Sequence, residues 1–520
     1  MSKSLTVVCL LLLGAGAVFA DTLWTATYAG PNIGDNTPCA VGTDTFNNVV
    51  VVGTSAGATG MGTDMVAVKY SWFHGNQLWV NRISKADTSD NVATAAVVSP
   101  GGSVTLTGQT GRSTNHNMLT VHLGPNGNEV WRDTYDGSAH GADIGMAIAT
   151  DTAGNYFVAG CVQNSTKDYV VIKYNPDGTR AWVKTYDAGG SDSATAITLG
   201  QDGSIFVTGQ SSSEFGTVKY TAAGTQDWVK TYNGPYSAPS WPASMAVDSS
   251  GSVYVTGTVR TQAGMSGRNQ IGTVKYDSGG VQKWTAVYDV NGSQPAALAL
   301  GPSAVYVTGW TPGTSGSDCV TFAYNDSSGD TLWMRRDSND VPAAVAVGTD
   351  SSVWVAGTGN YDFMTVLYSP DGARHWVEKT GTAASKSIVA MSLDKNNKIA
   401  VTGGTWAGGG NDFLTVKFDT LPLGIAESRG GEPVSGLRLS VAPNPVAAGK
   451  ATLRLGVVNG RAANLTVSGV DGRVVLTRTL AAGRADGTYP LDLTGFNAGV
   501  YMVRLESGGR SATQKLVVGR

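Results

Sequence analysis

Short apolar runs separated by turn sequences make up most of the chain between residues 21 and 419. The runs VYVTG at 253–257 and TVKY at 217–220 are typical, because β-branched and aromatic residues favour strands. Turns such as Asn175-Pro-Asp-Gly178 stand between them, since asparagine, aspartate and glycine tolerate the backbone angles of tight turns. The pattern predicts an all-β fold of many short strands.

A tryptophan recurs along this region and marks a repeat. Five of these tryptophans are followed four positions later by a tyrosine, and positions i and i+4 of a strand share one face. Each interval also holds an alanine-rich run, a run ending in glycine and a TVKY-like run. Four short strands in each repeat of about 50 residues predict the blades of a β-propeller. The tryptophans are Trp24, Trp79, Trp131, Trp182, Trp228, Trp284, Trp333 and Trp376.

The order of the runs predicts how the propeller closes. The strand around Trp24 precedes the first alanine-rich run, and the last TVKY-like run, at 414–418, has no tryptophan strand after it. We expect these chain ends to share one sheet, because pairing removes open strand edges. Counting the runs gives an eight-bladed propeller, with seven blades as the alternative. Alanine-rich strands should be innermost, where there is little room, and tryptophan strands outermost.

The motifs D-x-A-x-A, YVTG, TVKY, PDG and W-x-K-T-Y in residues 21–419 resemble the bacterial β-propeller family called SBBP repeats. The D-G-x-x-x-W pattern is also similar to the quinoprotein-type repeat, which forms eight-bladed propellers. Both resemblances imply a fold, and neither specifies an activity, because propellers host many unrelated functions.

Residues 438–520 differ from the repeats in pattern and charge. They contain 11 Lys or Arg and four acidic residues, a net charge of +7, whereas the whole chain carries −3. This change of sign indicates a domain boundary. Residues 420–437 lack periodicity and predict a linker, and the strand-like alternation from residue 438 onward predicts a small β-sandwich.

This C-terminal segment closely resembles the type A sorting domain of the type IX secretion system. The resemblance implies interaction with that machinery, passage through the periplasm and export, followed by release or attachment at the cell surface. An immunoglobulin-like adhesive domain is the alternative. The positions that match the sorting motif are Pro443, Asn444, Pro445, Gly499, Tyr501 and Lys515.

The first 20 residues have the pattern of a secretory signal. Lys3 precedes an apolar run from Leu5 to Phe19, and Val18 and Ala20 provide a small-residue exit. These features predict a signal peptide cleaved after Ala20. No later run is long and apolar enough to predict a transmembrane segment. We therefore expect an exported protein, soluble and monomeric, outside the cell or on its surface.

The composition and the short motifs of the chain exclude several structural and functional classes. The chain has 69 glycines, and its acidic residues are 33 Asp and only six Glu, which favours turns over helices. A net charge of −3 gives no reason to expect nucleic acid as a partner. Beyond the signal, Cys39, Cys161 and Cys319 have no partner spacing, so we interpret them as small buried apolar residues. The G-x-S-x-G match at 53–57 falls in a repeat position and is interpreted as structural.

Four aspartates precede the alanine-rich strands at what we take to be one repeat position: Asp90, Asp143, Asp192 and Asp340. Around a propeller they would form a ring at the mouth of the channel. Clustered carboxylates could bind Ca²⁺. Alternatively, each side chain caps the backbone of its own loop, and this second interpretation predicts no cofactor.

The loops on the same rim vary most between repeats, and Trp241, Trp310 and Trp406 lie outside the repeat positions. Variable loops on a rigid scaffold are typical of a binding face. The leading hypothesis is therefore a non-enzymatic binding module for an unknown protein or glycan, with Trp310 and Trp406 as candidate contacts. A quinoprotein-like or lyase-like secreted enzyme is the first alternative, although no adjacent cysteine pair is present. An envelope assembly scaffold is the second.

Overall fold

The computed structural model describes residues 22–518 apart from 32–33, 58–61, 85–88, 113–114, 261–267, 381–385, 419–437, 443–449, 457–462, 470–472, 481–486, 498 and 508–509. The predicted signal peptide (1–20) and linker (420–437) lie outside the described residues. The described residues form 39 strands and no helix, which confirms the all-β prediction. The chain divides into two compact units, Met1–Ala426 and Glu427–Arg520, and each is described by itself.

The first unit consists of four-stranded antiparallel sheets, seven of which are built from consecutive strands. The first four are β2 (Asn36–Thr43), β3 (Val49–Ala56), β4 (Thr63–Tyr70), β5 (Gln77–Ile83); β6 (Asp90–Val98), β7 (Val104–Arg112), β8 (Asn115–Leu123), β9 (Glu129–Tyr135); β10 (Ile144–Thr150), β11 (Tyr156–Gln163), β12 (Lys167–Tyr174), β13 (Arg180–Tyr186); and β14 (Asp192–Leu199), β15 (Ile205–Ser211), β16 (Glu214–Tyr220), β17 (Gln226–Tyr232). The next three are β18 (Trp241–Val247), β19 (Val253–Arg260), β20 (Asn269–Tyr276), β21 (Gln282–Tyr288); β22 (Gln294–Leu300), β23 (Ala304–Pro312), β24 (Ser317–Asn325), β25 (Thr331–Asp337); and β26 (Asp340–Val347), β27 (Val353–Gly359), β28 (Asp362–Tyr368), β29 (Arg374–Thr380).

An eighth sheet joins the two ends of the unit. It contains β30 (Lys386–Leu393), β31 (Ile399–Trp406), β32 (Asn411–Phe418) and β1 (Thr22–Tyr28), in the order β1-β32-β31-β30. Strand β1 pairs antiparallel with β32 from Thr22↔Phe418 to Tyr28↔Phe413. The expected pairing of the chain ends is confirmed.

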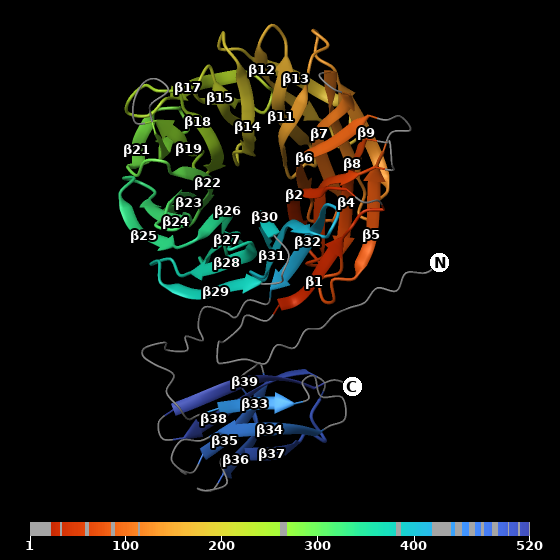
Figure 1. Cartoon of the computed structure of the whole chain (residues 1–520), viewed down its shortest axis with the longest axis vertical. Coiled ribbons are helices and arrows are strands. Elements are labelled where there is room, and N and C mark those ends of the chain that lie inside the picture. The colour runs from red at the N-terminus through yellow and green to blue at the C-terminus, as the bar shows by residue number, and fades with distance from the viewer. Residues whose placement is uncertain are drawn as a thin grey trace. The chain divides into compact units, whose positions relative to one another are not determined.

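The sheets stand radially around a central channel (Figure 1). The first strand of each sheet packs against the first strands of both neighbouring sheets, in the closed series β2, β6, β10, β14, β18, β22, β26, β30 and back to β2. The first unit is thus a β-propeller. As expected, the alanine-rich strands are innermost and the tryptophan strands form the outer edge of each sheet.

The hydrophobic core is divided among the spaces between neighbouring sheets. In one such cluster Val50 and Met65 of the first sheet pack with Leu106 and Val121 of the next. Seven of these spaces are closed at the outside by a tryptophan that lies on a turn of the following sheet. Trp24 Nε1, for example, donates a hydrogen bond to the carbonyl of Trp72 at 3.0 Å. Trp79, Trp131, Trp228, Trp284 and Trp333 donate to a turn carbonyl in the same way, whereas Nε1 of Trp182 and Trp376 has no hydrogen-bond partner among the described residues.

A glycine makes this contact possible. Gly75 has a φ of +66°, and a Cβ there would lie 2.6 Å from the Trp24 ring. The turns of six following sheets place Gly127, Gly178, Gly224, Gly280, Gly329 and Gly372 against a tryptophan in the same way. Only glycine combines a positive φ with such a close approach, which explains the turn sequences that separate the runs.

The second unit has seven strands in two sheets. One sheet contains β33 (Arg438–Ala442), β34 (Lys450–Gly456) and β37 (Gly487–Asp492); the other contains β36 (Val474–Leu480), β35 (Ala463–Gly469), β38 (Gly499–Ser507) and β39 (Arg510–Val518). Leu453 and Leu491 of the first sheet share one core with Leu465, Val503 and Leu516 of the second. A small unit of this kind buries its apolar residues between the two sheets.

The three cysteines of the propeller are free thiols. Cys161 and Cys319 are buried and Cys39 is half-buried. Burial raises the pKa of Cys319 to about 12, so this thiol stays protonated at neutral pH. The interpretation of the buried pair as small apolar residues is in line with these surroundings.

Candidate functional site

The propeller has two unlike faces, which follow from its strand order. Short turns join the first strand to the second and the third to the fourth on one face, here called the turn face. The other face, here called the loop face, carries the starts of the innermost strands and the loops between the second and third strands. The predicted binding residues all lie at the loop face.

Every innermost strand has a register shift near its start, and this shift defines the repeat position. In β6 the shift lies between Ala93 and Ala95, so the residue two places before it is Asn91. The prediction placed Asp90 there and is wrong by one residue, because the bulge cannot be located from the sequence. The residues at this position are Asn36, Asn91, Asp143, Asp192, Ser240, Ser293, Asp340 and Lys386.

The carboxylates at this position contact nearby backbone and side-chain donors. Asp143 accepts hydrogen bonds from the amides of Gly137 at 2.5 Å and Gln163 at 3.2 Å. Asp340 accepts one from Lys379 Nζ at 2.6 Å. Burial raises the pKa of the Asp143 and Asp340 carboxyls. The backbone amides on Asp143 are the contacts that the capping interpretation expects, whereas Asp340 forms an ion pair with a side chain of β29 instead.

Asp90 also caps a loop from its own place. Its carboxylate accepts hydrogen bonds from the amide and the hydroxyl of Thr63 at 2.9 and 3.3 Å. Thr63 begins β4 of the preceding sheet. The Asp90 carboxylate therefore links two neighbouring sheets.

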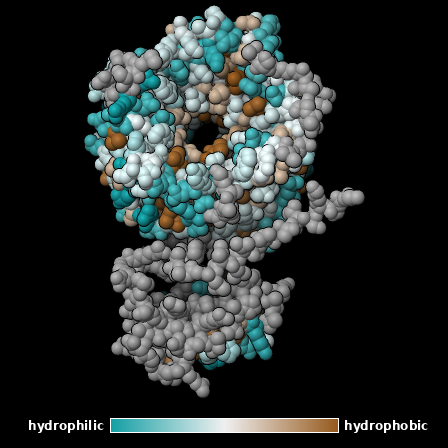
Figure 2. All heavy atoms as spheres, in the orientation of Figure 1, coloured by the Kyte–Doolittle hydropathy of each residue, from teal (hydrophilic) through white to brown (hydrophobic). Residues whose placement is uncertain are grey.

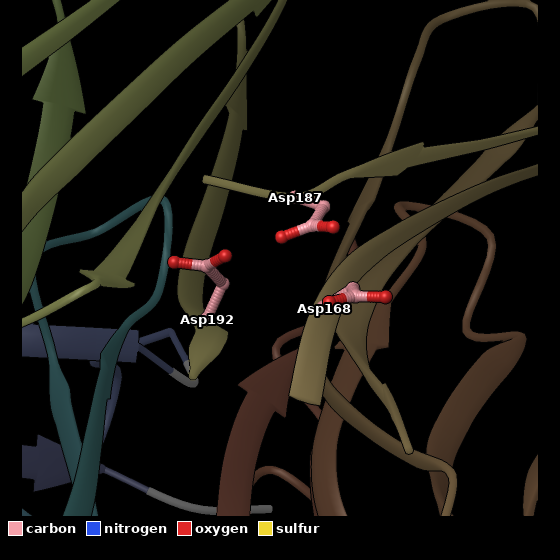
Figure 3. Close-up of side chains that lie close together, drawn as sticks. All are labelled: Asp168, Asp187 and Asp192. Carbon is pink, nitrogen blue, oxygen red and sulfur yellow. The ribbon is translucent and has the colours of Figure 1, made fainter. Parts of the chain in front are cut away.

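Asp192 belongs to a group of three carboxylates that the sequence did not predict (Figure 3). One oxygen each of Asp168, Asp187 and Asp192 lies within 4.8 Å of the others, and Asp168 and Asp192 are buried. Asp168 is on β12, Asp187 follows β13 and Asp192 begins β14, so only the packing of neighbouring sheets brings them together. Oxygen ligands of this kind suit a hard cation such as Ca²⁺.

The other repeats show why this group is unusual. Asp64 and Asp318 occupy the place of Asp168 in their own sheets, and they form ion pairs with Arg82 at 2.6 Å and Arg336 at 2.7 Å. The residue equivalent to these arginines is Thr185, as the strand registers show. The group is instead held by local donors: Asn164 Nδ2 to Asp168 at 2.5 Å, and the amides of Ala188 and Ser212 to Asp192 at 2.8 and 2.9 Å.

We expect Asp192 to act as a cap that needs no ion. Asp192→Ala should lower the free energy of unfolding by about 1–3 kcal/mol, because two amides lose their acceptor, while Asp192→Asn should cost less. The melting temperature of the purified protein should be the same with Ca²⁺ and with a chelator. A loss of several degrees in chelator that Asp187→Ala abolishes would contradict this expectation and identify a cation site.

The wall of the channel at the loop face is uncharged. Of the residues just before each register shift and inside each bulge, Met146, Val341 and Val389 are exposed, whereas Cys39 and Ala343 pack against the core. Figure 2 shows hydrophobic residues at several points around the opening, among residues of intermediate hydropathy. None of these positions carries a charged residue: Thr37, Val92, Ile144, Ser193, Trp241, Gln294, Val341 and Ser387 before the shift, and Cys39, Thr94, Met146, Thr195, Ala243, Ala296, Ala343 and Val389 within it.

A depression lies in this wall among the described residues. It has a volume of about 450 Å³ and is open to solvent. It spans the innermost strands β10, β14 and β18, with one residue from β15. Its lining residues are Met146, Ser193, Ala194, Thr195, Gln210, Trp241 and Pro242.

Trp241, Trp310 and Trp406 lie at the loop face in different settings, whereas Trp72, also outside the repeat tryptophans, is 43% exposed in the β4–β5 turn of the turn face. Trp406 ends β31 and is 53% exposed. Trp310 is half-buried on β23, opposite Gln294 and Cys319. Trp241 begins β18 and lines the depression. The structure therefore does not bring Trp310 and Trp406 into that depression.

The G-x-S-x-G match does not have the surroundings of a catalytic serine. Ser55 is buried on β3, its hydroxyl donates to Asn36 Oδ1 at 2.5 Å and Arg82 donates to it at 2.7 Å. A nucleophile elbow places its serine on a turn between a strand and a helix, and Ser55 lies instead within a strand.

The sorting-motif residues fall in the second unit. Pro443, Asn444 and Pro445 lie outside the described residues. Gly499 and Tyr501 are on β38, and the Tyr501 hydroxyl donates to the carbonyl of Asn497 at 2.9 Å. Lys515 is on β39, opposite Met502.

Comparison with known protein families identifies the second unit. The family model "Secretion system C-terminal sorting domain" matches residues 440–519. The chain therefore carries a type IX sorting domain, which implies interaction with that secretion machinery and export to the cell surface or the medium. No helix among the described residues is long and apolar enough to cross a membrane.

Solved structures resemble the propeller at low identity. Sqt1 from Chaetomium thermophilum, solved with the N-terminus of the ribosomal protein L10, has a TM-score of 0.52 and 12% identity over 77% of this chain and 100% of that chain. The Dos1 propeller has a TM-score of 0.49 and 10% identity, over 74% and 93%. The quinohemoprotein alcohol dehydrogenase from Comamonas testosteroni has a TM-score of 0.46 and 13% identity, over 78% and 77%. At these identities the likeness concerns the fold alone. No curated protein matches the chain.

Proposed function

We propose that the protein is an exported eight-bladed β-propeller of the SBBP-repeat type, a monomer that acts as a binding module outside the cell. Each four-stranded sheet of the first unit is one blade. A signal peptide (1–20) directs the chain to the periplasm. The propeller comprises residues 21–419, and a linker (420–437) joins it to the sorting domain (438–520). This sorting domain is a small β-sandwich that directs the protein out of the cell.

The observation that carries the proposal is that three of the tryptophans that depart from the repeat gather at one face, while Trp72 departs from it on the other. Contacts that hold the blades together, such as a tryptophan on a turn glycine, recur at seven places around the ring. Trp241, Trp310 and Trp406 depart from the repeat and all lie at the loop face. Residues that a scaffold does not require are free to serve recognition.

Binding of the purified exported protein to the surface of the producing cells tests this proposal. We expect saturable binding that weakens by at least about fivefold when Trp406 and Trp310 are both replaced by alanine. Phe46→Ala is the matched control, because Phe46 is 71% exposed in a turn of the opposite face. The absence of saturable binding, or an equal loss in the control, would refute the proposed role of the loop face.

A further inference from the structure

The depression between β10, β14 and β18 has features that the propeller fold does not require. Trp241 stands one place before the register shift of β18. The other seven innermost strands have threonine, valine, isoleucine, serine or glutamine at the same place. Those strands fold and pair in the same way, so an indole is not needed there for folding. The equivalent residues of the other seven strands thus show which side chains the fold accepts at this place.

The indole of Trp241 is held in position. Trp241 is half-buried, its backbone pairs with Thr258, and the Arg260 guanidinium lies 5.1 Å from its ring centroid. An aromatic ring under a guanidinium is stabilised by a cation–π contact. Arg260 is not among the residues that line the depression, and its contact with the ring helps to orient the indole.

The lining combines an apolar surface with uncharged polar groups. Trp241, Pro242, Ala194 and Met146 form the apolar part, and Met146 is 37% exposed because it occupies the bulge of β10. The hydroxyl of Thr195 and the amide of Gln210 lie beside this surface on exposed side chains.

Nearby charge does not enter the depression. Asp192 precedes Ser193 in the chain, but it is fully buried and both of its oxygens accept backbone amides. A purely apolar partner would leave the Thr195 and Gln210 groups without hydrogen bonds, which costs free energy. An anionic or cationic partner would find no opposite charge in the lining.

We infer that this depression is a binding subsite for an uncharged sugar residue of a glycan. A pyranose ring has an apolar face of C–H groups that can pack on the indole, and its hydroxyls can pair with the Thr195 hydroxyl and the Gln210 amide. The volume of about 450 Å³ lies within the range of small-ligand sites. Because the depression is open to solvent, it can take one residue of a longer chain rather than enclose a free monosaccharide.

This inference rests on the proposed binding function and names its ligand class. We would titrate the purified exported protein with neutral hexasaccharides of glucose, mannose, galactose and xylose, and with polygalacturonate as the anionic comparison. At least one neutral hexasaccharide should bind, with an affinity unchanged by salt, since no charge pair forms. Binding of polygalacturonate alone, or of no glycan, would overturn the inference.

Variants designed from the repeat keep the test independent of folding. Trp241→Val introduces the residue that β6 has at the same place, so the variant should fold. It should bind the neutral hexasaccharide at least about tenfold more weakly, and Gln210→Ala should also weaken binding. Phe46→Ala, on the turn face, should bind as the unchanged protein does. Equal affinity in Trp241→Val would overturn the assignment.

Cell binding separates this inference from the proposed function. If binding to the cell surface survives periodate oxidation of glycans but is lost after protease treatment, the sugar assignment fails and the binding module stands. If no saturable binding occurs with or without these treatments, both the sugar assignment and the proposed binding function fail.

Discussion

Replacing Trp24 with alanine is expected to lower the free energy of unfolding by about 3–5 kcal/mol, the usual cost of truncating a well-buried tryptophan. Trp24 is 6% exposed and packs with Tyr70 of the next blade, with ring centroids 5.8 Å apart. Its strand is also the only one in the closing sheet that comes from the other end of the first unit. Loss of the indole therefore removes core contacts and weakens the closure of the ring.

Two other tryptophans provide controls for this prediction. Trp284 is 7% exposed and donates to the carbonyl of Asp326 at 3.0 Å, so Trp284→Ala removes a similar contact from a blade built of consecutive strands. Trp406→Ala removes an indole that is 53% exposed and should change stability little. Chemical denaturation should rank Trp24→Ala as the least stable of the three. A smaller loss than in Trp284→Ala would mean that β1 contributes little to closure.

The fold of the propeller could be predicted because each repeat carries the residues that determine its strands and turns. The glycine of a turn such as Gly75, the tryptophan that follows it at Trp79 and the alternation around them are local in sequence, and their repetition leaves few alternatives. Closure followed from the order of the runs, since the Trp24 strand had no sheet of its own. The contact between Trp24 and the turn of the next sheet could not be foreseen, because it depends on how neighbouring sheets pack.

The candidate sites were less predictable for the same reason. The bulge that puts Asn91 rather than Asp90 at the repeat position has no marker in the sequence. Asp168 and Asp187 join Asp192 only because three strand ends meet, and Met146 and Gln210 join Trp241 only across neighbouring sheets. A signal was present for Trp241, which breaks the repeat. Departures from a repeat thus point to single residues, while the three-dimensional structure shows which of them meet.

A variant that lacks residues 438–520 is expected to fold and to remain in the periplasm. The first unit closes with residues 22–418, through the pairing of Thr22 with Phe418, so its closure does not use the sorting domain. A secretory signal directs a chain across the inner membrane only. The second step needs another address, and residues 440–519 match a secretion sorting domain.

Fractionation of a host with the type IX machinery, combined with protease accessibility on intact cells, measures this effect. The full chain should reach the surface or the medium, and the truncated chain should be protected from added protease and released by osmotic shock. Fusing residues 438–520 to an unrelated periplasmic protein should carry that protein outward, which shows that the segment suffices and controls for misfolding of the truncated propeller. Export of the truncated chain at the normal level would refute the role of the sorting domain, because the address would then lie in the propeller itself.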